Sequence, residues 1–125
     1  MNLLLDTHAL LWWLEDNPTL SEQARTAIAK GENLVFVSAA TAWEIAIKKP
    51  LGKLEAPDNL EEVMAANRFE PLPITIRHAL AVAELPKHHE DPFDRMLAAQ
   101  AKVEGLTLVT RDRFLTKYDI RFIQA

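Results

Sequence analysis

The 125-residue sequence contains no cysteine and only three glycines. The lack of cysteine excludes disulfide frameworks, thiol catalysis, and zinc or iron–sulfur centres that depend on cysteine ligands. The three glycines (Gly31, Gly52 and Gly105) are far apart in the chain. The sequence therefore has no glycine-rich loop of the kind that cradles phosphates in P-loop and dinucleotide-binding proteins.

Long hydrophobic runs are also absent. The longest apolar run, at 9–14, has six residues, and a membrane-spanning helix needs about 20. No basic stretch followed by a long apolar segment opens the chain, as it would in a secretory signal. We therefore expect no membrane segment and a cytoplasmic protein.

The overall composition is typical of a globular domain. Hydrophobic residues make up 49% and charged residues 26% of the chain, and the length favours one domain over residues 1–125. The net charge of −4 argues against a protein that coats nucleic acid nonspecifically, because phosphate binding usually requires a basic surface. The acidic balance raises the question of whether a cation neutralises some of these carboxylates.

Short apolar segments alternate with helical segments along the chain. Strands are predicted at 2–5, 34–37, 69–72, 106–110 and 120–123. Helices are predicted at 9–14, 21–30, 38–49, 59–67, 75–85 and 91–104, with a helical turn at 112–117. This alternation is typical of a parallel sheet covered on both faces. We predict an α/β fold, a single-domain three-layer α/β/α sandwich with a mostly parallel sheet.

Four acidic residues, three of them at strand ends or helix starts, are candidates for the edge where a parallel sheet of this kind forms its sites, beyond the carboxyl ends of strands. Asp6 directly follows the first predicted strand, and Asp112 lies two residues beyond the fourth. Glu44 lies about two turns into the helix after the second strand, and Asp94 lies in the first turn of a later helix. Carboxylates that converge there would repel one another unless they held a hard cation such as Mg²⁺ or Mn²⁺.

Each of these acids also has a purely structural interpretation. Asp6 and Asp112 can cap the helical segments that follow them. Glu44 can form a surface ion pair with Lys48, four residues later. Asp91, followed by proline, can cap the start of a helix, and Asp94 then lies in the first turn, where an acidic residue is favoured. On the residues alone, the capping interpretation and the metal-site interpretation both remain open.

Four separate motifs resemble the PIN domain and, more narrowly, the VapC-type toxin ribonucleases of type II toxin–antitoxin pairs. They are Leu3-Leu4-Leu5-Asp6-Thr7-His8, Trp43-Glu44-Ile45, Asp91-Pro92-Phe93-Asp94-Arg95-Met96-Leu97-Ala98-Ala99-Gln100-Ala101 and Leu108-Val109-Thr110-Arg111-Asp112. Their order and spacing extend the resemblance over the whole chain.

The resemblance implies a PIN-like fold and an endoribonuclease that depends on Mg²⁺ or Mn²⁺. The family's four acidic positions correspond to Asp6, Glu44, Asp94 and Asp112. Asp6 and Asp94 would be direct ligands of the main ion, while the other two acids complete the shell, hold a second ion or orient the water. Thr110 matches the hydroxyl residue that commonly stands two positions before the last acid. Asp91 is an additional acid, either a helix cap or an outer contact to the metal.

The resemblance also implies partners: an RNA substrate, a VapB-type antitoxin and a second copy of the chain in a homodimer. The apolar run at 9–14, together with Trp43, can line a groove for another chain, although a helix wedged into the core explains the run equally well. Two other functions stay open, a non-catalytic binding module and a PIN-type nuclease that acts on DNA or structured nucleic acid outside a toxin–antitoxin system.

The histidines and basic residues are less informative. The spacing of the histidines fits no standard zinc motif, so we expect them at the surface, with His8 able to contact substrate. These residues are His8, His78, His88 and His89. Two basic groups can bind RNA phosphates or form solvated surfaces. They comprise Lys48, Lys49 and Lys53 near Glu44, and Arg111, Arg113 and Lys117 near Asp112.

Overall fold

A five-stranded parallel sheet forms the centre of the computed structural model, which describes residues 1–125. Its strands are β1 (Asn2–Leu5), β2 (Leu34–Ser38), β3 (Glu70–Leu72), β4 (Thr107–Thr110) and β5 (Phe122–Gln124). They lie in the order β3-β2-β1-β4-β5, and every neighbouring pair is parallel. The predicted α/β class and parallel sheet are therefore confirmed.

The central strands are mainly apolar because both faces of the sheet are covered. Leu3 and Leu5 of β1 pack into the core on one face, while Leu4 between them packs into the core on the other. In β4, Val109 packs into the same core as Leu3 and Leu5, and Leu108 packs into the same core as Leu4. The leucine run that opens the chain thus supplies both hydrophobic cores at once.

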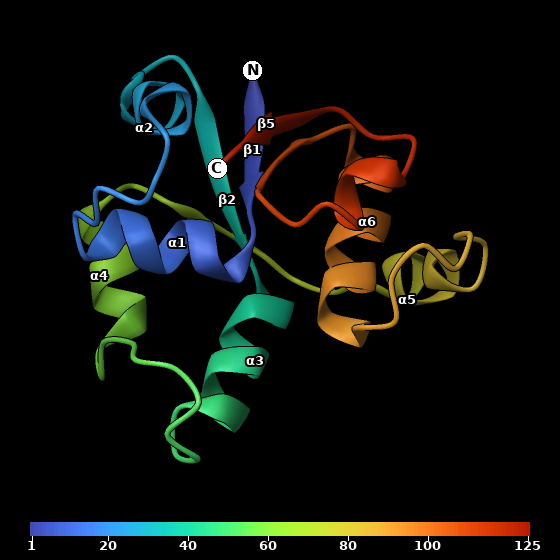
Figure 1. Cartoon of the computed structure of the whole chain (residues 1–125), viewed down its shortest axis with the longest axis horizontal. Coiled ribbons are helices and arrows are strands. Elements are labelled where there is room, and N and C mark those ends of the chain that lie inside the picture. Colours follow the sequence, from blue (N-terminus) through green and yellow to red (C-terminus); the bar gives the residue numbers. More distant parts are fainter.

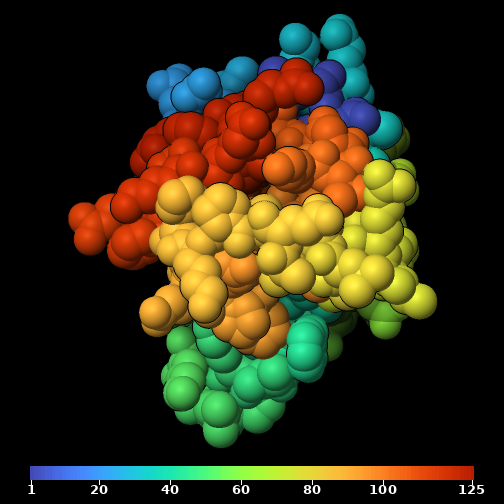
Figure 2. Space-filling view, turned by 90° about the vertical axis from the view of Figure 1, so that its right-hand side faces the viewer, coloured from blue at the N-terminus to red at the C-terminus, as the bar shows by residue number.

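Helices cover both faces of the sheet and make the three predicted layers (Figure 1). On one side lie α1 (Thr7–Leu14), α2 (Glu22–Ala29) and α4 (Leu60–Ala66), and on the other lie α5 (Ile76–Val82) and α6 (Pro92–Glu104). The remaining helix, α3 (Ala39–Lys48), continues from the carboxyl end of β2. Figure 2 shows the face on which the chain from α5 into α6, yellow to orange, covers the middle of the molecule.

Local capping explains where the helices begin and end. Asp6 accepts a hydrogen bond from the backbone N–H of Ala9, so α1 begins at Thr7, two residues earlier than predicted. Ser21 and Ser38 cap α2 and α3 as expected. At the end of α6, Gly105 takes the left-handed conformation with φ of 68°, which glycine adopts without steric cost.

Two predicted elements near the carboxyl terminus differ from the structure. The helical turn is a 3₁₀ helix, η1 (Leu115–Lys117), because the Asp112 side chain accepts from the backbone N–H of Phe114 and turns the chain first. The last strand begins at Phe122 rather than at residue 120. The N–H of Ile120 bonds to the carbonyl of Tyr118, which keeps this segment in a turn.

The order of the strands determines where a site can form. β1 and β4 are hydrogen-bonded neighbours although about a hundred residues separate them, and the chain leaves β1 toward β2, on the opposite side from β4. Such a topological switch point opens a crevice at the carboxyl ends of the two strands. None of the helices has the length and hydrophobicity that a membrane-spanning segment requires.

Candidate metal centre

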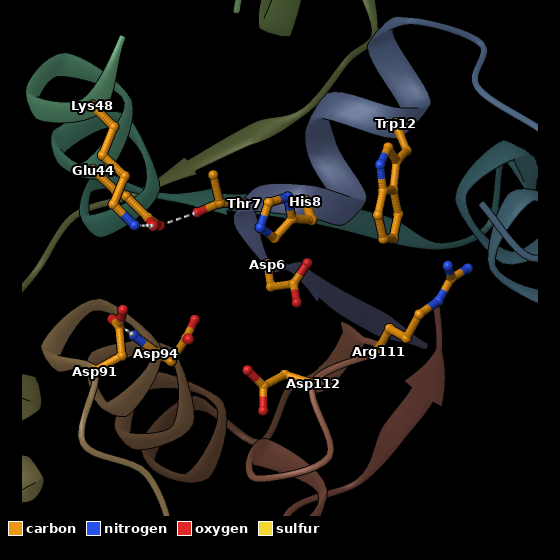
Figure 3. A pocket seen from close by; sticks show the side chains of 10 residues that line it. All are labelled: Asp6, Thr7, His8, Trp12, Glu44, Lys48, Asp91, Asp94, Arg111 and Asp112. Atoms are coloured by element: carbon orange, nitrogen blue, oxygen red, sulfur yellow. Dashed lines mark hydrogen bonds and ion pairs between the residues drawn. The ribbon is translucent and has the colours of Figure 1, made fainter. Parts of the chain in front are cut away.

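A cleft of about 270 Å³ lies at the carboxyl ends of β1 and β4 (Figure 3). Four of the lining residues are the acids predicted from the sequence, and they come from four separate segments of the chain. The cleft is lined by Asp6, Thr7, His8, Trp12, Glu44, Lys48, Asp91, Asp94, Arg111 and Asp112. The fold therefore brings together all the predicted acids, with Asp91 beside them.

Asp6 lies at the base of this cleft, directly after β1, and only 6% of it is exposed. One carboxylate oxygen accepts from the N–H of Ala9 at 2.8 Å, so Asp6 caps α1 and lines the cleft at the same time. Burial raises the pKa of Asp6, while a hydrogen bond from the side chain of Thr110 acts in the opposite direction. The hydroxyl of Thr110, the buried last residue of β4, also accepts from the backbone N–H of Asp112 at 3.0 Å.

Asp94 lies in the first turn of α6, and its surroundings strongly perturb its carboxyl group. Burial, followed by the charge of Asp91, raises the pKa of Asp94 to about 7. The charges of Asp6 and Asp112 act in the same direction. Without a cation, this part of the cleft therefore holds a proton over a pH range in which an ordinary aspartate has lost it.

Asp112 is fixed through both of its oxygens. Oδ1 accepts from the N–H of Phe114 at 2.8 Å, and Oδ2 lies 2.9 Å from Nε2 of His89. Burial acts to raise the pKa of Asp112, but the hydrogen bonds from His89 and from the backbone outweigh it, so the pKa is lowered. Asp112 thus carries its charge more readily than Asp6 or Asp94, whose pKa values are raised.

His89 links Asp112 to Asp94, and this corrects the prediction that it is a surface residue. Its Nε2 lies 2.9 Å from Asp112 and 3.1 Å from Asp94, and the ligand atoms of these three residues lie within 4.8 Å of one another. Nδ1 of His89 accepts from the backbone N–H of Asp91, and the backbone N–H of His89 donates to the hydroxyl of Tyr118. A neutral ring therefore carries its proton on Nε2, directed at the two carboxylates.

Glu44 faces the cleft from α3 and is buried at its edge. Thr7 donates its hydroxyl to Oε1 of Glu44 at 2.6 Å, and Lys48 pairs with Oε2 (Figure 3). The hydrogen bond to Glu44 raises the pKa of Lys48. The predicted ion pair between Glu44 and Lys48 is thus present, and both of its members line the cleft. Glu44 therefore forms this ion pair and is also part of the site.

Other candidate residues lie outside the cleft. His78, also expected at the surface, is 1% exposed because it completes the capping box of α5 and contacts Glu104 at 2.8 Å. Of the two basic groups, only Lys48 and Arg111 line the cleft. Lys49 pairs with Asp58, and Lys53 is exposed. Arg113 and Lys117 lie over the ring of Phe114.

The apolar run at 9–14 belongs largely to the core. Ala9, Leu10 and Leu11 are buried, and Trp12 and Trp13 are partly buried against the same cluster. The structure thus favours the helix wedged into the core over a free interface. Trp43, by contrast, is 61% exposed on α3 and is available to another chain.

The donors in this cleft suit a hard divalent cation. Carboxylate oxygens are the ligands that Mg²⁺ and Mn²⁺ prefer, and the cleft offers them from Asp6, Asp94 and Asp112. The raised pKa of Asp94 and the position of the His89 N–H between Asp94 and Asp112 both reduce the net negative charge of the clustered carboxylates. A bound cation would serve the same purpose, so the residues present fit such an ion.

Comparisons with known proteins agree with this arrangement. Residues 3–120 match the PIN domain family. The chain is 31% identical over 119 residues to ribonuclease VapC22 of Mycobacterium tuberculosis, covering 93% of this chain and 91% of that one. The fold is similar to a chain of VapBC2 from Rickettsia felis bound to a promoter DNA fragment, with TM-score 0.71, 15% identity and 98% of each chain covered.

A second solved structure has the same fold. It is DNA-bound VapBC from Salmonella typhimurium, with TM-score 0.68, 20% identity, and 98% of this chain and 97% of that chain covered. The fold, the acidic cleft and these matches define a PIN domain. The chain belongs to the PIN-domain family, as a relative of its VapC-type ribonucleases.

Proposed function

We propose that this protein is a Mg²⁺- or Mn²⁺-dependent endoribonuclease that acts as the toxin of a toxin–antitoxin pair. The observation that carries the proposal is the convergence of Asp6, Glu44, Asp94 and Asp112 in one cleft from four separate segments. A non-catalytic binding module has no need for four carboxylates in a common cleft, where their repulsion destabilises the fold.

The acids divide into two groups by their surroundings. Asp6, Asp94 and Asp112 line the cleft without a lysine or arginine partner, and they would hold the ion. Glu44 is occupied by Thr7 and Lys48, so it keeps the Lys48 ammonium at the cleft, where it can attract a phosphate. Asp91 acts first as the N-cap of α6, because its Oδ1 accepts from the N–H groups of Phe93 and Asp94.

When bound, the divalent ion would lower the pKa of a coordinated water and stabilise the charge of the scissile phosphate. The chain's own part is to fix the carboxylates that hold it. Backbone N–H groups hold Asp6 and Asp112, and the hydroxyl group of Thr7 holds Glu44. The hydroxyl of Thr110 accepts from the backbone N–H of Asp112. Nothing in this scheme requires a protein nucleophile, in agreement with a chain that has no cysteine.

The partner proposed for the toxin is a VapB-type antitoxin, with a second copy of the chain completing a homodimer. The support comes from the relatives: the similar chains belong to VapBC assemblies. We place the reaction in the cytoplasm, on cellular RNA.

The proposal is tested by expressing the chain alone in a bacterial host and mapping the ends of cleaved cellular RNA. We expect growth arrest and new RNA ends that carry a 5′-phosphate and a 3′-hydroxyl. Asp6→Asn should remove both effects. Asp58→Asn, which changes an exposed aspartate paired with Lys49 outside the cleft, is the matched control and should leave them unchanged.

Two results would contradict the proposal. The first is equal RNA cleavage by wild type and Asp6→Asn. The second is cleavage of DNA, with RNA left intact, by the purified chain. That result would favour a PIN-type nuclease outside toxin–antitoxin systems.

A further inference from the structure

One wall of the cleft is aromatic, and the proposed chemistry makes no use of it. Trp12 is the single hydrophobic residue among those that line the cleft. The imidazole of His8 stacks on its indole, with ring centroids 5.7 Å apart and planes inclined by 29°. His8 is exposed and Trp12 is partly buried, and both side chains lie beside the carboxylate of Asp6 (Figure 3).

The helix geometry of α1 produces this stack. His8 and Trp12 are four residues apart and therefore lie on the same face of the helix. The neighbouring Trp13 points elsewhere, since its Nε1 donates to Asn67 at 3.0 Å and its ring packs beside Phe69. Both tryptophans pack against the core, but only Trp12 also lines the acidic cleft.

Arg111 fixes the far end of the stack. Its guanidinium lies over the Trp12 ring, with Cζ 4.6 Å from the ring centroid, and it donates to the carbonyl groups of Thr19 and Ala125. The carbonyl groups and the ring together hold the guanidinium in place. Trp12 is therefore held in one orientation, and a positive charge stands next to it in an otherwise acidic cleft.

We propose that His8 and Trp12 form a base-binding subsite for the nucleotide next to the scissile phosphate of single-stranded RNA. The inference rests on the proposed function. An aromatic platform within the same cleft as the proposed metal ligands would hold a base while its phosphate lies at the carboxylates. Arg111 and Lys48, the two cations of the cleft, would attract the adjoining phosphates.

The chemistry of the platform sets the expected selectivity. Stacking requires an unpaired base, so the subsite favours single strands over duplexes. Every nucleobase has a π-face, so stacking alone discriminates weakly among bases. We therefore expect the subsite to select unpaired RNA next to the cut and to leave base identity to other contacts.

The test is binding of a single-stranded RNA hexamer that carries 2-aminopurine, with Ca²⁺ in place of Mg²⁺ and the probe shown by gel to remain intact. His8→Ala should raise the Kd of the hexamer by about 10-fold, as expected for the loss of one stacked base. Trp12→Leu should also raise the Kd, because it removes the ring against which the His8 imidazole stacks. His8→Phe and Trp12→Phe should restore most of the affinity, because they restore a flat ring. Binding should also change 2-aminopurine fluorescence in wild type and less in His8→Ala.

The matched control is His88→Ala. His88 is also an exposed histidine with an aromatic neighbour, Tyr118, but it lies outside the cleft. It should leave the Kd unchanged. Melting temperatures of all variants show whether they fold. If Trp12→Leu does not fold, His8→Ala alone still decides the test.

The outcomes separate this subsite from the proposed nuclease function. A wild type that cleaves RNA, with a hexamer Kd that His8→Ala and Trp12→Leu leave unchanged, overturns the subsite and leaves the function standing. Phenylalanine variants that bind as weakly as His8→Ala also overturn it. So does a loss of affinity for the antitoxin alone, which would assign this wall to the protein partner. A wild type that neither binds nor cleaves RNA overturns both proposals.

Discussion

Single carboxyl groups in this cleft have pKa values that burial and neighbouring charges shift away from the ordinary range. Asp94 is the clearest case, because its pKa of about 7 follows from burial and from the charge of Asp91 beside it. An ordinary aspartate has a pKa of 3.8. Between these two values the folded protein keeps a proton that the unfolded chain has lost, and each increase in pH in this window lowers the free energy of unfolding. The stabilising contribution is present below about pH 4 and is lost as the pH rises through about 7.

Asp94→Asn removes this titration and should therefore change stability in a pH-dependent way. Without metal, its melting temperature should equal that of wild type near pH 4 and exceed it near pH 7.5. Mn²⁺ should raise the melting temperature of wild type more than that of the variant, because the ion binds only the folded form. Melts in EDTA and in Mn²⁺ across this pH range check the prediction. A variant that melts several degrees below wild type at pH 7.5 in EDTA would mean that Asp94 mainly stabilises α6.

His89 is the second residue whose effect can be measured separately. It bridges Asp94 and Asp112 through one nitrogen, and partners that orient metal ligands typically contribute 10–100-fold to affinity. His89→Ala should therefore weaken Mn²⁺ binding by about 10-fold or more in calorimetry, while His88→Ala should not. Unchanged or tighter Mn²⁺ binding by His89→Ala would show that the imidazole does not position these carboxylates for an ion.

The roles of single residues were only partly predictable from the sequence. Asp6, Asp94 and Asp112 could be assigned to one cleft because each follows a strand or begins a helix at the same edge of the sheet. His89 could not, because its loop is held by the Tyr118 hydroxyl, 29 residues away in the sequence. His78 was misplaced for the same reason, since its burial depends on Glu104 and Gln100 of another helix.

At the scale of elements, the start of α6 holds Asp94 in place. Asp91 accepts from the N–H groups of Phe93 and Asp94 at 2.8 and 3.1 Å, and Pro92 occupies the first helical position. Proline there has its backbone angle already set for a helix. This pattern made α6 the most accurately predicted helix. β5 begins later than predicted, because the chain turns at Tyr118, and the strand propensities of the sequence do not reveal that turn.

Replacing Asp91 separates its capping role from a contact to the metal. Asp91→Ala should lower the free energy of unfolding by about 1 kcal/mol, the usual value of an N-cap. Asp91→Ser should recover most of that stability, because serine also caps helices well. Denaturant unfolding measures the stability, and calorimetry measures Mn²⁺ affinity. If Asp91→Ser keeps the stability but binds Mn²⁺ at least 10-fold more weakly, Asp91 also contacts the ion.

At the scale of the whole molecule, the strand order creates the cleft and α3 offers a surface for another chain. Trp43 and Ile47 are both exposed and lie four residues apart on α3, with Leu51 exposed just beyond. Residues at this spacing share one face of a helix, so they form an apolar stripe that solvent covers only at a cost in free energy.

Trp43→Glu should weaken dimerisation or antitoxin binding while leaving the free chain folded. Because the side chain is exposed, the free energy of unfolding should change by no more than about 0.5 kcal/mol. Gln23→Glu adds the same charge on the exposed surface of α2 and is the matched control. Sedimentation and antitoxin titration provide the measurement. Unchanged self-association and antitoxin affinity in Trp43→Glu would exclude this stripe as an interface.

The central claim is that the converging carboxylates make a metal-dependent ribonuclease. The most direct measurement is the rate at which the purified chain cleaves a single-stranded RNA in Mn²⁺, compared with the rate in EDTA and with the rate of Asp94→Asn. We predict cleavage by wild type and by Asp58→Asn in Mn²⁺, none in EDTA, and a loss of at least about 100-fold in Asp94→Asn. Equal rates in Mn²⁺ and EDTA, or equal rates for wild type and Asp94→Asn, would contradict the claim.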